Sequence, residues 1–163
     1  MRLRHPDGTV VHLGYGTNVL PAEDVDGVVA QATGLGDRLR ALLGVPRVGL
    51  GLWLPAQAAH RLARAPEEVA QVRTRLAEHG VEVVTLNAFP AADFQGPTVK
   101  KAVYLPTWAE RARLEHTLDA ATVLAGLLPD DAARGSISTL PLGWRAPWLG
   151  DRQRLAERHL GEL

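Results

Sequence analysis

The sequence predicts an α/β protein in which four strand–helix units follow one another in a single domain, residues 1–163. Three observations lead to this fold class. Short runs rich in valine, leucine and glycine alternate with longer segments whose apolar residues recur every three to four positions. Glycine and proline separate these segments. The second strand segment is nearly continuous in apolar residues and glycine, which is typical of strands in parallel sheets. The alternation favours half of an eight-stranded β/α barrel or a small open sheet.

The first unit follows a turn signal at Asp7-Gly8. A β-type run over residues 9–15 predicts the first strand. Residues 21–43 are predicted to form the first helix, because a proline stands at its start and apolar residues recur with helical spacing. Two internal glycines, Gly34 and Gly36, lower the helical propensity of this segment.

The remaining units are predicted in the same way. Prolines and glycines again mark where each segment begins or ends, and Pro66 starts a second helix within one of them. The long connection between the third strand and the third helix is of a length that often forms a binding loop. The predicted segments are a strand at 47–54, a helical region at 55–79, a strand at 81–87, a connection at 88–108, a helix at 107–128, a strand at 134–140 and a helix at 151–160.

Composition excludes several classes of protein. Lys plus Arg and Asp plus Glu both number 18, so the basic excess of a nucleic-acid-binding protein is missing. The chain has no cysteine, and therefore no disulfide or thiolate metal site. No stretch has the length and apolarity of a signal peptide or a membrane span. We therefore expect a cytoplasmic protein that binds no nucleic acid and does not span a membrane.

Candidate site residues follow from the rule that parallel α/β proteins place their sites at the carboxyl ends of the strands. Asn18 and Asn87 offer amide groups suited to the hydroxyl or carbonyl groups of a small ligand. Thr139 follows the fourth strand. Trp144 can form a stacking wall, and Arg145 can bind a carboxylate or phosphate.

Each candidate has a structural alternative. Either asparagine can instead cap a helix or fix a turn. Trp144 can instead pack in the core. Lys100 and Lys101 in the long connection can meet an anionic ligand, or can remain a solvated pair.

The histidines and hydroxyls indicate no catalytic set. His60, His79, His116 and His159 fall on predicted helices or just before strands, and we expect them at the surface. His12, within the first strand, is interpreted as a buried imidazole rather than as a ligand or base. The serines of the fourth strand have no evident His–Asp partners. No metal-ligand pattern is present. Catalytic residues are therefore unassigned, and no metal site is predicted.

Four motifs together resemble a known family. They are His12-Leu13-x-Tyr15-x-Thr17-Asn18-Val19-x-Pro21-Ala22-Glu23, Thr85-Leu86-Asn87-Ala88-Phe89-Pro90, Val99-Lys100-x-x-Val103-Tyr104-x-Pro106-x-Trp108 and Gly135-Ser136-Ile137-Ser138-Thr139-Leu140-Pro141-Leu142. In this order they resemble the metabolite-traffic protein EboE family, which belongs to the xylose-isomerase-like TIM barrels. The resemblance implies a half-barrel of that type, residues 1–163, and a role with a small-molecule metabolite.

The chain departs from the family in two positions and in length. Gly16 stands where the family has cysteine, and Leu20 where it has histidine. Family members are full barrels, and in the related sugar isomerases the metal ligands come mostly from later strands. The resemblance therefore implies no cofactor here, with a divalent metal only if a second barrel half supplies its ligands. We expect a homodimer, a second half-barrel as partner, or a chain that is a piece of a longer barrel.

Three functions remain open at the level of the sequence. The first is binding or trafficking of a small metabolite, as the resemblance implies. The second is a metal-dependent sugar isomerase or epimerase. The third is an inert, truncated barrel that dimerises through its open sheet edges.

Overall fold

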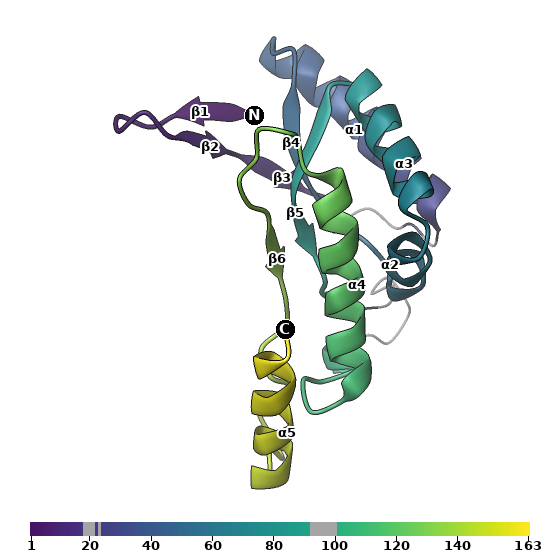
Figure 1. Cartoon of the computed structure of the whole chain (residues 1–163), viewed down its shortest axis with the longest axis vertical. Coiled ribbons are helices and arrows are strands. Elements are labelled where there is room, and N and C mark those ends of the chain that lie inside the picture. The colour runs from purple at the N-terminus through teal and green to yellow at the C-terminus, as the bar shows by residue number, and fades with distance from the viewer. Residues whose placement is uncertain (18–21, 23, 92–100) are drawn as a thin grey trace.

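The computed structural model describes residues 1–17, 22, 24–91 and 101–163. It confirms the α/β fold: four parallel strands lie in the order β3-β4-β5-β6 (Figure 1). Strands adjacent in the sheet are consecutive units of the sequence, as in half of a β/α barrel. The strands are β3 (Gly14–Gly16), β4 (Val48–Trp53), β5 (Val81–Asn87) and β6 (Ser136–Ser138).

The first four helices cover one face of this sheet (Figure 1), and their apolar residues form one cluster with those of β4 and β5. Among the described residues, no helix is long and apolar enough to cross a membrane. The helices are α1 (Val25–Leu43), α2 (Ala56–Ala63), α3 (Pro66–Glu78), α4 (Arg111–Leu127) and α5 (Gly150–Gly161), with a 3₁₀ turn η1 at Ala102–Tyr104.

The single first strand predicted at 9–15 is wrong, because this run belongs to two sheets. β1 (Arg2–Arg4) and β2 (Val10–His12) form an antiparallel hairpin that projects from the main sheet (Figure 1). Gly8 turns the hairpin with a φ of 91°. At Leu13, whose N–H donates to Met1 O at 2.8 Å, the hairpin pairing ends, and β3 then pairs with β4. The run itself contains no break that would indicate this change of partner.

Strand β4 determines the character of both sheet faces. Val48, Leu50 and Leu52 point into the helix-covered core. Because successive side chains alternate, Gly49 and Gly51 face the other way. A Cβ on Gly51 would lie 2.9 Å from Thr85 Cγ2, so the glycine leaves room for the threonine of the neighbouring strand. The opposite face, called the helix-free face below, therefore has no side chain at these two positions of β4, although Trp53 at the end of the strand falls on it by the same alternation.

A β-bulge in β5 aligns the side chains of β5 with those of β4 on the same sheet face. The pairing of β4 with β5 shifts between Leu50 and Gly51, so that Gly51 pairs with Thr85 and not with Val84. Thr85 and Asn87 consequently lie on the helix-free face, while Leu86 between them joins the core. The valine-rich run predicts a strand here but not the bulge.

A second, smaller apolar cluster closes the carboxyl end of the sheet. It consists of Trp108, Leu114, Leu140 and Ala156, and it joins α4 to α5. His159 on α5 is buried there, and its Nδ1 lies 2.8 Å from Trp108 O. The expectation that His159 is a surface residue is therefore wrong, because α5 packs this side of the helix against the strand-end loops.

Two predicted boundaries also move. The helix predicted from Thr107 begins at Arg111, because the backbone N–H and hydroxyl of Thr107 both donate to Glu110 Oε1 at 2.8 Å and form a turn first. The strand predicted at 134–140 is hydrogen-bonded only over Ser136–Ser138.

Gly36 provides a test of how closely α1 packs on the sheet. A Cβ at Gly36 would lie 2.3 Å from Val81 Cγ2, whereas a Cβ at the exposed Gly34 meets no atom within 4 Å. We expect Gly36→Ala to lower the free energy of unfolding by about 1–3 kcal/mol through overpacking. The matched control Gly34→Ala should raise it by about 0.5–1 kcal/mol. Urea unfolding measures both, and equal stabilisation by the two variants would contradict this packing.

Candidate functional site

Polar side chains gather at the carboxyl end of the helix-free face. Two cross-strand pairs form there: Ser136 Oγ donates to Thr85 Oγ1 at 3.0 Å, and Ser138 Oγ donates to Asn87 Oδ1 at 2.8 Å. Both serines are exposed, and both partners on β5 are half-buried. The face thus presents a short ladder of hydroxyl and amide groups, which can bind the hydroxyl groups of a ligand.

Asn87 is the central residue of this ladder. Its Oδ1 also accepts a hydrogen bond from Phe89 N at 3.3 Å, so the side chain is held by both strand and loop. Within the part of the chain that the structure describes, its Nδ2 donates no hydrogen bond. The side-chain oxygen of Asn87 thus fixes the turn at Phe89, as the structural alternative proposed. Its two amide N–H groups can donate hydrogen bonds to a ligand.

Aromatic side chains continue from the end of β5. The ring of Phe89 lies 5.8 Å from that of Tyr104, and Tyr104 lies edge-on to Trp144 at 5.2 Å. Lys101 Nζ lies 5.2 Å from the centre of the Trp144 ring. These four residues, called the aromatic row below, unite the long connection with the loop after β6.

The predicted site residues have different outcomes. Asn18, together with Lys100, lies outside the described residues. Asn87 and Trp144 are brought to the same sheet edge and are linked through the aromatic row. Thr139 and Arg145 are exposed in the loop after β6, and Trp144 is half-buried. The structure thus places Trp144 at the surface of the row and not in either apolar cluster.

Sequence reasoning missed Arg113, which is fully buried on α4. Its Nε donates to Pro106 O at 2.8 Å and its NH1 donates to Ala88 O at 2.7 Å, so it ties together the two ends of the long connection. Burial lowers the pKa of Arg113 to about 10, which leaves it charged at neutral pH. Helical spacing gave no indication of this role, because an arginine on a helix usually faces solvent.

His116, one turn further along α4, is also buried, and the expectation of a surface residue is wrong. Neither ring nitrogen has a hydrogen-bond partner in the described part of the chain. Burial lowers the pKa of His116 to about 4, and the charge of Arg113 acts in the same direction. The imidazole is therefore neutral at physiological pH and serves packing beneath the site.

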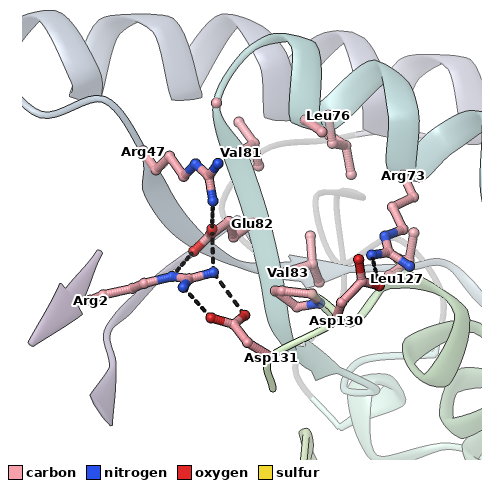
Figure 2. A pocket seen from close by; sticks show the side chains of 13 residues that line it. Arg2, Arg47, Arg73, Leu76, Val81, Glu82, Val83, Leu127, Asp130 and Asp131 are labelled. Atoms are coloured by element: carbon pink, nitrogen blue, oxygen red, sulfur yellow. Dashed lines mark hydrogen bonds and ion pairs between the residues drawn. The ribbon is translucent and has the colours of Figure 1, made fainter. Parts of the chain in front are cut away.

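A cavity of about 350 Å³ opens at the opposite end of the sheet, where β5 begins (Figure 2). There Arg2 of the hairpin donates from Nε to Glu82 Oε2 at 3.0 Å and from NH2 to Glu82 Oε1 at 2.8 Å. Arg2 also forms an ion pair with Asp131. Arg47 NH1 donates to Glu82 Oε1 at 3.1 Å. Arg73 pairs with Asp130 on the far wall.

The charges of this cavity balance within the chain. Burial of Glu82 opposes its ionisation, but hydrogen bonds from Arg2 and Arg47 outweigh burial and lower the pKa of the carboxyl group. His12, predicted as a buried imidazole, is half-buried here with Nδ1 4.0 Å from Glu82 Oε2. We interpret the cluster as the anchor of the hairpin, because each charge described in it already has a partner.

The described residues contain no group of three or more His, Asp or Glu side chains placed to hold a metal ion. Comparison of the chain with protein-family models, with curated proteins and with solved structures finds no match. The functional argument therefore depends on the site itself.

His116 makes stability depend on pH. The unfolded chain binds a proton on this histidine near pH 6.5, but the folded chain does so only near pH 4. The His116 contribution is therefore complete above about pH 6.5 and is lost as the pH falls towards 4, by about 3 kcal/mol. We expect His116→Leu to flatten the slope of unfolding free energy between pH 6.5 and 4.5. The exposed-histidine variant His60→Gln is the control, and an unchanged slope in His116→Leu would contradict this assignment.

Proposed function

We propose that this protein binds a small, hydroxyl-rich metabolite at the carboxyl end of its sheet. One observation carries the proposal: the Asn87–Ser138 pair, whose amide N–H groups have no partner in the described part of the chain, is joined through Phe89 to a half-buried aromatic row. Amide and hydroxyl groups orient a polyol, and a tryptophan face stacks on its ring. The role in metabolite traffic that the EboE resemblance implies is in keeping with such a site.

The proposal is for binding without chemistry on this chain. Three buried titratable groups lie near the strand ends: Arg113 and His116 on α4, and His159 on α5, whose Nδ1 lies 2.8 Å from Trp108 O. Arg113 and His116 are packed in the protein interior, and Arg113 donates hydrogen bonds to two backbone carbonyl groups. The polar groups that face outward are hydroxyls and amides, which bind a ligand without exchanging protons with it near neutral pH.

Asn87→Asp tests this site without changing its shape. The variant keeps the oxygen that accepts from Ser138 and Phe89, but it loses the amide donors. We expect a loss of about tenfold or more in affinity, which corresponds to one or two hydrogen bonds. Isothermal titration with a panel of sugars and cyclitols measures it. The control Thr122→Ala removes a hydroxyl that bonds Leu118 O on α4, and no binding by any panel member would overturn the proposal.

We further propose that two copies complete the barrel around this site. Among the described strands, β3 pairs only with β4, and β6 only with β5, so each has one free edge. A two-fold axis parallel to the strands would place β6 of each copy beside β3 of the other with the strand direction preserved. The exposed Leu13 and Tyr15, each about half accessible, lie at the β3 edge beside an apolar cavity of about 220 Å³. Their burial favours such a seam.

Gly16→Pro tests the seam at β3. Thr17 N donates to Gly51 O, so alternation points the amide of Gly16 away from β4. Proline there removes an outward donor and leaves the β3–β4 bonds intact. Light scattering after size-exclusion chromatography should give twice 17.6 kDa for the wild type and for Gly34→Ala, but 17.6 kDa for Gly16→Pro. A monomeric wild type at all concentrations would rule out the dimer.

A further inference from the structure

Two loop segments at the carboxyl end of the sheet contain basic side chains and no acidic ones. Segments 101–108 and 139–148 contain Lys101 and Arg145 and no Asp or Glu. Neither cation forms an ion pair with any residue in the described ranges, in contrast to Arg2, Arg47 and Arg73 at the other end of the sheet. Arg2, Arg47 and Arg73 are thus paired at one end of the sheet, whereas Lys101 and Arg145 at the other end have no acidic partner among the described residues.

Lys101 does not extend freely from the surface. Its ammonium group lies over the Trp144 ring at 5.2 Å, a cation–π geometry that directs the charge towards the aromatic row. Arg145 follows Trp144 directly in the chain and is exposed. One cation therefore contacts the Trp144 ring, and the other is its neighbour in the chain.

The two loops that hold these residues are fixed to each other. Trp108 N donates to Leu142 O at 2.9 Å. A Cβ at Gly143 would lie 3.0 Å from Thr107 Cγ2. The absence of a side chain at Gly143 therefore allows the two loops to pack closely. The second apolar cluster packs below them, with Tyr104 against its edge. Fixed loops present the charges at a defined place, which reduces the entropic cost of binding.

From these observations we infer that the metabolite is an anionic sugar or cyclitol, one whose ring carries a phosphate or carboxylate group. Its hydroxyl groups bind Asn87 and Ser138, its ring lies along Trp144, and its anionic group lies between Lys101 and Arg145. Guanidinium and ammonium groups bind such anions through charge-assisted hydrogen bonds. This inference rests on the proposed function and adds the charge of the ligand.

Matched pairs of ligands test the charge. Isothermal titration compares glucose with glucose 6-phosphate, xylose with xylose 5-phosphate, and myo-inositol with inositol 1-phosphate. We expect at least one charged member to bind about tenfold or more tightly than its neutral partner at low salt, with the advantage falling as salt is raised. The double variant Lys101→Met and Arg145→Met should abolish this preference. Both side chains are exposed, so folding should be retained, and circular dichroism checks it.

Arg134→Gln is the matched control, because it removes an exposed positive charge just before β6, at the opposite end of that strand. It should leave the preference for charged ligands intact. If neutral ligands bind as tightly as charged ones, the inference about ligand charge is overturned. If Asn87→Asp also weakens that binding, the proposed function is retained. The inference also fails if the charged preference survives in the double variant. No binding by any of the six compounds would overturn both.

Discussion

The alternation of apolar residues and glycine along β4 is the constraint on which the rest of the structure depends. Leu50 and Leu52 bind the sheet to the helices, and burial of two such side chains contributes several kcal/mol. Gly49 and Gly51 place no side chain on the other face. The side chains of β5 and β6 can therefore form hydrogen-bonded pairs over that face, and one strand separates an apolar core from a polar surface.

The two ends of the sheet use charge in opposite ways. Where the strands begin, Arg2 and Arg47 meet Glu82 and Asp131, and the hairpin is held by ion pairs that carry no net charge. Where the strands end, half-buried aromatic rings lie with Lys101 and Arg145, two exposed cations that form no ion pair with any described residue. Charges that are already satisfied stabilise a fold, whereas unpaired charges beside an aromatic surface are available to a ligand. For this reason the proposed site lies at the carboxyl end, although the described cavity of about 350 Å³ lies at the other end.

Arg113 links the core to the site. A buried guanidinium group is costly unless its charge is compensated by hydrogen bonds, and here two backbone carbonyl oxygens accept from it. These two carbonyl groups belong to opposite ends of the connection that carries Phe89, Lys101 and Tyr104. The position of the aromatic row therefore depends on a residue that is fully buried.

The sequence by itself determined the fold class, the order of the four parallel strands and the end of the sheet at which Asn87, Trp144 and Arg145 lie. Periodicity, glycine and proline are local properties, and the packing rules for parallel sheets extend them to the whole fold. Only the tertiary structure decided the division of the first strand, the bulge in β5, the pairing of Asn87 with Ser138, and the burial of His116. These features depend on which segments meet across long sequence separations. Local pattern does not encode this, because the same valine-rich run fits either a hairpin or a parallel sheet.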